Sequence, residues 1–222
     1  MNRHIQAFTP NACRICLVRH GETSWNAERR LQGHIDIPLN QRGHAQAQST
    51  AHSLAAFHFS AMYSSDLQRA HVTAQAIAAQ RPQPLLTEQR LRERHYGHFQ
   101  GLTYDEAATR YPEAYARFTA RELDQPIPGQ GESLTAFAAR VREALADIAQ
   151  RHTGQNVLVV THGGVLDIAH RLAAAKPLHT PRDFAIPNAA LNWIEHDAGC
   201  WRLIHWGDER HLAQALDELP DA

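Results

Sequence analysis

Residues 15–23 read ICLVRHGET, a short apolar run that ends at an arginine, a histidine and a glycine. Residues 157–164 read VLVVTHGG and repeat this pattern far along the chain. Unbroken apolar runs of this length are typical of strands that are buried on both faces of a parallel sheet. Helical periodicity over 43–55, 66–79 and 134–151 predicts helices that cover such a sheet. The two runs therefore indicate the centre of an α/β fold.

Further strands are predicted outside the two apolar runs. Residues 61–64 and 84–87 are candidate strands between the predicted helices. Residues 191–196 and 201–205 flank the turn-forming Asp-Ala-Gly at 197–199, which predicts a hairpin. A hairpin at the end of an alternating strand and helix pattern indicates an antiparallel edge on a parallel sheet.

The whole pattern predicts one domain over residues 1–222, with a three-layer, doubly wound, mostly parallel sheet. Residues 103–131 interrupt the alternation with aromatic and charged side chains and end in a stretch rich in proline and glycine. We expect this segment to be a helical cap inserted over one end of the sheet. No internal repeat or low-complexity linker marks a second domain.

Charge and composition exclude several classes of protein. The 222 residues include 22 Lys plus Arg and 23 Asp plus Glu, a formal net charge of −1, so no global field attracts nucleic acid or a membrane surface. The apolar runs are far shorter than the roughly 20 residues of a membrane helix. Three cysteines are too few for a disulfide framework, and the CxxC at 13–16 runs into a strand instead of opening a helix. Residues 1–12 lack a signal-peptide pattern, so we expect a short leader and a cytoplasmic protein.

Two histidines follow the predicted central strands. Ligands of open parallel sheets bind beyond the carboxyl ends of the strands, where His20 and His162 are expected. Gly21 and Gly163 come next, and glycine allows a tight turn and brings main-chain N–H groups close to an oxyanion. Arg19 adds a guanidinium group that binds two phosphate oxygens at once. This combination favours a phosphate site.

Each candidate has a structural alternative. The chain holds 16 histidines, most of them expected at the surface, and only the repeated context distinguishes His20 and His162. Arg69 fits a second phosphate ligand or a solvated helix residue. Glu93 fits a proton donor to a leaving alkoxide or a surface ion pair. Asn26 fits a phosphate contact or a helix cap.

These residues together resemble the histidine phosphatase superfamily, which includes the cofactor-dependent phosphoglycerate mutases. The segment LVRHGETSWN at 17–26 is an intact version of the family signature. The other family segments follow in family order: Gln32-Gly33, DIPL at 36–39, SSDLQRA at 64–70, LRE at 91–93, GES at 131–133 and THG at 161–163. The tail GDERHL at 207–212 resembles that of small bacterial members often labelled a second phosphoglycerate mutase.

The resemblance implies a metal-independent phosphatase that forms a phosphohistidine at His20. Arg19, Arg69 and His162 would bind the phosphoryl group, and Glu93 would donate and accept the proton. The nucleophilic ring needs one unprotonated nitrogen, so its other nitrogen is expected to donate to a carbonyl near Gly21. No cofactor or metal is implied, and the partner would be a small phosphorylated metabolite. The further substrate contacts implied are Gly21, Glu22, Thr23, Asn26, Gln32, Gly33, Tyr96 and Gly163.

The cap separates the remaining hypotheses. Mutases of the family carry an adjacent arginine pair in the cap that holds the substrate carboxylate, whereas this chain has the separated Arg117 and Arg121, which favours a phosphatase. The segment ERHYG at 93–97 matches the mutase version, so a mutase that uses 2,3-bisphosphoglycerate is the alternative. A catalytically inactive binding module is disfavoured because every catalytic candidate is present. The phosphoester and a homodimer are left open. The cap aromatics fit a cap core or a substrate lining: Phe99, Tyr104, Tyr111, Tyr115 and Phe118.

Overall fold

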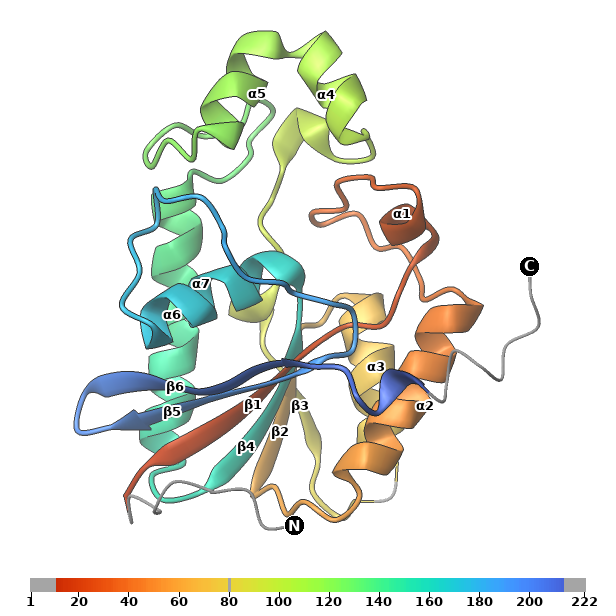
Figure 1. The fold of residues 1–222 in the computed structure, drawn as a ribbon, viewed down its shortest axis with the longest axis vertical. Coiled ribbons are helices and arrows are strands. Elements are labelled where there is room, and N and C mark those ends of the chain that lie inside the picture. The colour runs from red at the N-terminus through yellow and green to blue at the C-terminus, as the bar shows by residue number, and fades with distance from the viewer. Residues whose placement is uncertain (1–10, 80, 214–222) are drawn as a thin grey trace.

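The computed structural model describes residues 11–79 and 81–213 (Figure 1). Most of the predicted leader, residues 1–10, lies outside the described residues. No helix in the described part of the chain combines the length and apolarity needed to cross a membrane. The elements run in the order β1 Cys13–Arg19, α1 Ser24–Ala27, α2 Gln41–Leu54, β2 Ala61–Ser64, α3 Gln68–Ala78, β3 Leu85–Thr87, two 3₁₀ turns at Gln89–Leu91 and Gly97–Phe99, α4 Tyr104–Arg110, α5 Pro112–Thr119, α6 Leu134–Arg151, β4 Asn156–Thr161, α7 Gly163–Ala173, β5 Leu191–Asp197 and β6 Cys200–Asp208.

One six-stranded sheet with the order β3-β2-β4-β1-β5-β6 forms the middle layer. β3, β2, β4 and β1 are parallel, and β5 and β6 form the antiparallel edge, as predicted. β1 and β4 are neighbours, and their register pairs Arg19 with Thr161. The residues that follow these two, His20 and His162, therefore leave the same edge of the sheet side by side.

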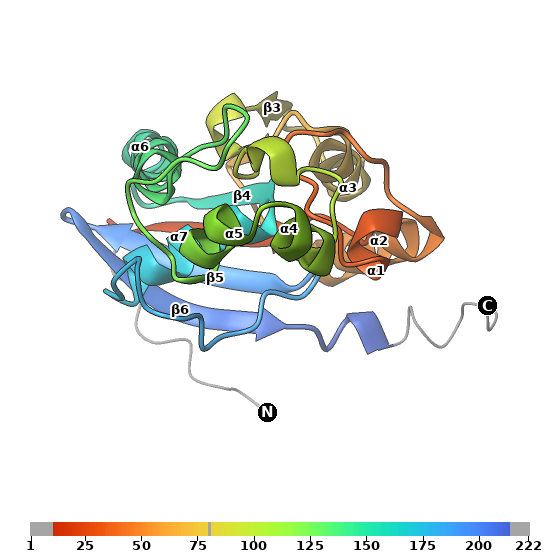
Figure 2. The ribbon, with the colours of Figure 1, turned by 90° about the horizontal axis from the view of Figure 1, so that it is seen from above.

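The central strands are buried on both faces, which is why their sequence lacks alternation. Ile15 and Leu17 of β1 pack in the core shared with α6 and α7, and Cys16 and Val18 pack in the core shared with α2 and α3. Each such aliphatic side chain contributes about 1.5–3 kcal/mol by burial. Seen from above, α6 and α7 lie on one side of the sheet and α2 and α3 on the other (Figure 2). The predicted three-layer, doubly wound α/β class is confirmed.

The starts of two helices differ from the predicted ones because of side-chain hydrogen bonds. α2 begins at Gln41, earlier than periodicity predicts, because Asn40 caps it by accepting from the amide of Gly43 at 2.8 Å. α3 begins at Gln68 and not at residue 66. The carboxylate of Asp66 instead accepts from Arg92 at 2.7 and 2.6 Å, outside the helix.

The CxxC segment is a part of β1 and not a redox motif. Cys13 belongs to the core on one face of the sheet, and Cys16 belongs to the core on the other face, so their side chains point apart. Burial raises the pKa of the Cys13 thiol to about 11 and raises that of Cys16 further. Both thiols are therefore protonated and inert at neutral pH.

The helices α4 and α5 lie beyond the carboxyl ends of the strands, within the predicted cap at 103–131 (Figure 1). Their core is aromatic, with the Phe99 and Phe118 rings edge to face at 5.7 Å and Tyr111 and Tyr115 packed beside them. These four residues belong to the cap core, together with Leu31, Ala107 and Ile127. Tyr104 is 40% exposed and lies outside this cluster. The single-domain organisation stays a prediction.

Candidate active site

His20 follows β1 directly and is 3% exposed. Its Nδ1 donates to the carbonyl oxygen of Gly21 at 2.7 Å, the hydrogen bond expected for a nucleophilic ring, which leaves Nε2 unprotonated. Burial, followed by the charges of Arg69 and Arg19, holds the pKa of His20 well below its usual value. The ring is therefore neutral at physiological pH and can attack an electrophile.

His162 lies beside His20, with the two ring centroids 5.2 Å apart. Its Nε2 bonds to the hydroxyl of Ser65 at 2.8 Å, while its Nδ1 is buried and has no partner among the described residues. Burial, with the charges of Arg69 and other cations nearby, also holds the pKa of His162 well below its usual value. In the free site His162 is therefore neutral, and the tautomer in which Ser65 donates to Nε2 makes Nδ1 an N–H donor.

Arg69 and Arg19 supply the positive charge of the site. Arg69 is completely buried and holds the next loop through Nη2 to the carbonyl of Gly33 at 2.7 Å and Nη1 to that of Ile35 at 2.9 Å. Arg19 donates from Nη1 to the carbonyl of Ile186 at 2.6 Å. Burial lowers the pKa of Arg69 to about 10, so the group is still charged at neutral pH.

The donors left over define an oxyanion site. The Nε groups of Arg19 and Arg69 and the Nδ1 of His162 are buried without a hydrogen-bond partner in the described part of the chain. Neither arginine forms an ion pair with a described carboxylate. Buried donors and charges without partners are costly unless a ligand completes them. A phosphate group carries the charge and the acceptor oxygens that these donors lack.

Glu93 lies next to Arg19 at the start of α7. Its Oε2 accepts from the amide of Gly164 at 2.9 Å, and its Oε1 accepts from the amide of Arg94 at 2.7 Å. A Cβ placed on Gly163 would lie 3.5 Å from the Nε of Arg19 and 3.9 Å from Oε2 of Glu93, so the two side chains meet over this glycine. A Cβ placed on Gly164 would lie only 2.1 Å from Oε1 of Glu93, so this position has room for glycine alone. Sequence reasoning missed Gly164, although it is the second glycine of HGG.

Four predicted contacts lie on the loop that follows His20. Thr23 and Asn26 cap each other around α1: the Asn26 amide donates to Thr23 Oγ1, and the Thr23 amide donates to Asn26 Oδ1, both at 3.1 Å. Asn26 is therefore a capping residue, the alternative noted from its sequence position. The Oε1 of Gln32 is buried without a partner among the described residues. Gly33 has a φ of +56°, which favours glycine, and its carbonyl holds Arg69.

Gly21 and Glu22 hold the signature segment to α2 and α3. The amide of Gly21 donates to Thr73 at 3.0 Å, and a Cβ on Gly21 would lie 2.4 Å from the carbonyl oxygen of Gly43. Close packing against α2 requires this glycine, and its N–H is already occupied, contrary to the expectation that it binds phosphate. The carboxylate of Glu22 accepts from Asn40 at 2.9 Å and so points toward the start of α2.

Tyr96 and Asn188 extend the site. Tyr96 packs edge to face on Phe118 of the cap core at 6.0 Å, and burial, followed by the charge of Glu93, holds the pKa of its hydroxyl well above its usual value. Tyr96 is thus a protonated donor between the cap and the carboxyl group. Asn188 donates to the carbonyl of His20 at 2.9 Å and fixes the main chain of the nucleophile. No sequence pattern marked Asn188, because it lies on an irregular segment before β5.

The pKa of His20 leads to a pH prediction. Because folding lowers this pKa, the ring takes up a proton only at a pH well below that at which a free histidine does, and we expect its NMR signal to stay constant throughout the pH range in which a free histidine titrates. The chemical shift of the Cε1–H signal of His20, which is assigned by its loss in His20→Asn, reports the protonation of the ring as the pH is lowered. In the chain unfolded by urea the same signal should titrate near about pH 6.5. A midpoint near that value in the folded protein would contradict the proposed neutral nucleophile.

Comparison with known proteins places this geometry among phosphoryl-transfer enzymes. The profile of the histidine phosphatase superfamily, branch 1, matches residues 15–209. "Phosphoglycerate mutase-like protein 4" of Arabidopsis thaliana is 44% identical over 203 residues, which cover 90% of this chain and 87% of that protein. The "Metal-independent phosphoserine phosphatase" of the same plant is 42% identical over 206 residues, which cover 90% of this chain and 83% of that protein.

A solved structure has the same fold. The chain resembles Bacillus stearothermophilus YhfR with a TM-score of 0.84 and 35% sequence identity. The match covers 90% of this chain and 99% of that one. Within the described residues, no three His, Cys, Asp or Glu side chains are grouped so that they could hold a metal ion.

Proposed function

Because the chain belongs to the histidine phosphatase superfamily, we propose that it hydrolyses a small phosphomonoester through a phosphohistidine at His20. One observation carries this proposal: a neutral, buried imidazole lies among three buried N–H donors that have no partner in the described part of the chain. Such a set holds a tetrahedral oxyanion and presents it to a nucleophile.

In the first step, Nε2 of His20 attacks phosphorus, and the bond from phosphorus to the ester oxygen breaks. Arg19, Arg69 and His162 bind the equatorial oxygens, where the charge is spread in the transition state. The leaving oxygen takes a proton from the carboxyl group of Glu93 and departs as an alcohol.

In the second step, water attacks the phosphohistidine. Glu93, now a carboxylate, accepts a proton from this water, the P–N bond breaks, and inorganic phosphate leaves. The imidazole returns to its neutral form and Glu93 to its acid form, so the atoms and charges balance. The two arginines provide the positive charge that a metal ion provides in other phosphoryl-transfer enzymes, which supports the absence of a metal requirement.

The cap supports a phosphatase over a mutase. Arg121 donates to the carboxylate of Asp167 at 2.7 Å and to the carbonyl of Leu178 at 2.6 Å, so it already has protein partners and is not free to hold a substrate carboxylate. Arg117 is exposed on α5. The cap core is aromatic. The one described guanidinium group that lies over a ring of this core, that of Arg94 over Phe118 at 5.7 Å, donates to the carbonyl of Glu132 and so also has a protein partner. A relative with phosphoserine phosphatase in its name makes phosphoserine the first substrate to test.

The remaining proposals concern the setting of the enzyme. We propose a cytoplasmic enzyme whose partner is a small phosphorylated metabolite and not a nucleic acid. The net charge of −1 supports the second part, because recognition of an anion is then local to the two arginines. Two of the three cysteines are buried and unpaired, which is compatible with a reducing compartment.

Release of inorganic phosphate from a panel of metabolite esters tests the function. The panel contains phosphoserine, 3-phosphoglycerate and nitrophenyl phosphate, with EDTA present throughout. We expect hydrolysis that EDTA does not reduce, together with a preference among the metabolites. Conversion of 3-phosphoglycerate to its 2-isomer with 2,3-bisphosphoglycerate, without phosphate release, would replace the phosphatase by the mutase. Neither turnover nor labelling of the protein would leave only the inactive binding module.

A further inference from the structure

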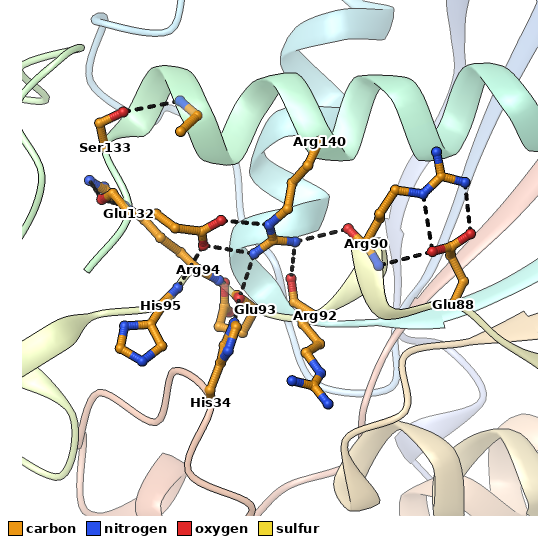
Figure 3. A network of polar contacts seen from close by, with 11 residues as sticks. His34, Glu88, Arg90, Arg92, Glu93, Arg94, His95, Glu132, Ser133 and Arg140 are labelled. Atoms are coloured by element: carbon orange, nitrogen blue, oxygen red, sulfur yellow. Dashed lines mark hydrogen bonds and ion pairs between the residues drawn. The ribbon is translucent and has the colours of Figure 1, made fainter. Parts of the chain in front are cut away.

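The main chain that carries Glu93 is held by one guanidinium group from α6. Arg140 donates from Nη1 to the carbonyls of Arg90 and Arg92 at 2.9 and 2.8 Å, and from Nη2 to that of Glu93 at 2.8 Å (Figure 3). Its Nε and Nη2 also bind both carboxylate oxygens of Glu132, at 2.6 and 2.8 Å. A guanidinium group has five N–H donors, and all five are used here.

Glu132 holds the other side of the same segment. Its Oε2 accepts from the amide of His95 at 2.8 Å, and its carbonyl accepts from Arg94 at 3.1 and 2.8 Å. Burial alone would raise the pKa of Glu132, but the hydrogen bonds from Arg140 and His95 hold it below its usual value. Glu132 and Arg140 therefore form an ionised pair that holds residues 92–95: Arg140 binds the carbonyls at its start, and Glu132 binds Arg94 and the amide of His95 at its end.

A third contact joins this segment to the loop that follows His20. His34, which follows Gly33, donates from Nε2 to the carbonyl of Glu93 at 2.8 Å. The Glu93 carbonyl thus accepts from Arg140 and His34 together, and the Glu93 side chain accepts from two main-chain amides. Every polar group of this residue except its own amide has a named partner, so the position of its carboxyl depends on the main chain that Arg140 holds.

The hydrogen bonds of Arg140 and Glu132 converge on one short segment, the main chain around Glu93, and a role in stability alone does not require this. The Arg140 and Glu132 side chains are 20% and 21% exposed, and a largely buried ion pair of this kind is by itself weak evidence for a role in stability. Their donors instead converge on a few consecutive main-chain groups around one carboxyl. Proton transfer needs donor and acceptor within hydrogen-bond reach, and a shift of about 1 Å costs roughly 10²-fold in rate.

We propose that Arg140 and Glu132 are positioning residues which fix the main chain of Glu93 and so place its carboxyl for proton transfer to the leaving oxygen. This inference rests on the proposed phosphatase function. It assigns to Arg140 of α6 a role in one chemical step. Substitution of a positioning residue of this kind should lower kcat most for substrates whose leaving group needs a proton.

Arg140→Lys tests the proposal because it keeps the charge and removes the planar fork. We expect kcat for phosphoserine, whose alkoxide leaving group needs a proton, to fall roughly 10²-fold, and kcat for nitrophenyl phosphate to fall far less. Arg142→Lys, on the exposed face of the same helix, is the matched control and should change either rate less than about twofold. Equal losses on both substrates in Arg140→Lys would overturn the proposal and leave Arg140 a general structural role.

Two further measurements keep the result unambiguous. In a Glu93→Gln background, Arg140→Lys should not lower kcat for phosphoserine any further relative to kcat for nitrophenyl phosphate. A further selective loss as large as that in the wild-type background would overturn the proposal. If Arg140→Lys does not fold, Glu132→Gln, which weakens the same pair, should show the same selectivity. The ratio of kcat for phosphoserine to kcat for nitrophenyl phosphate is compared between each variant and the wild-type enzyme. If the proposed function is wrong, the wild-type enzyme itself is inactive. If only this inference is wrong, the wild type is active and the variant loses activity equally on both substrates.

Discussion

His20→Ala is expected to abolish hydrolysis of every phosphomonoester, with kcat reduced at least roughly 10⁴-fold, while the chain stays folded. Nε2 of this ring is the atom that accepts the phosphoryl group, and no neighbouring nucleophile replaces it, because the Nδ1 of His162 acts as a donor in the same site. The fold should tolerate the change, since the His20 side chain lies buried among cations and donates one hydrogen bond, to the carbonyl of Gly21.

Two measurements check this result. Hydrolysis is measured with phosphoserine and with nitrophenyl phosphate, and intact-protein mass after an alkaline quench reports an acid-labile phosphoryl group on the wild type alone. His20→Asn, whose amide is able to donate toward Gly21, should be equally inactive. His58→Ala, at an exposed position, is the control and should keep full activity. Substantial turnover in His20→Ala would exclude a phosphohistidine at this position.

Glu93→Gln is expected to slow the two chemical steps in different ways. With an alkyl phosphate, loss of the acid should lower kcat by about 10²–10⁴-fold, because the alkoxide leaves without a proton. With nitrophenyl phosphate the first step needs no acid, so nitrophenolate should be released in a burst of one equivalent per enzyme. Turnover should then be slow, because no base activates the water that attacks the phosphohistidine.

Stopped-flow absorbance with nitrophenyl phosphate separates these steps. A burst in Glu93→Gln, with phosphorylated enzyme accumulating in the quenched sample, supports a residue that serves as acid and then as base. The amide satisfies only one of the two main-chain donors that Glu93 accepts, so Glu93→Asp, which keeps the carboxyl but shortens its reach, controls for displacement. Equal losses with both esters and no burst would assign Glu93 a positional role only.

The sheet was largely predictable because its signals are local. The apolar runs before His20 and His162 lack polar alternation because both faces of the sheet are covered by helices. The two residues of the hairpin turn, Ala198 and Gly199, both have positive φ, as a tight turn between antiparallel strands requires. The same strand ends pointed to the site, because parallel strands present their carboxyl ends at one edge. Helix starts were less predictable, because a capping side chain such as Asn40 decides them.

Other parts of the site depend on contacts that no local pattern carries. Glu132 stands directly before Ser133, whose side chain caps α6, so its place in the sequence indicates no role beyond the start of a helix. Glu132 and Arg140 are eight residues apart, and no local pattern shows that both also bind the segment around Glu93. The glycine at 21 was predicted for its N–H, but the close approach of α2 is what requires it.

The parallel pairing of β1 with β4 ties catalysis to completed folding. Arg19 lies opposite Thr161, so the two histidines meet only after segments from distant parts of the chain have closed a long loop, which is slow compared with the formation of a helix. A slip of β1 by one residue would turn Ile15 and Leu17 toward the wrong helices and move His20 out of line with His162. A compact chain with native helices but mispaired strands is therefore inactive, and the recovery of turnover during refolding marks the moment at which the central strands reach their native register.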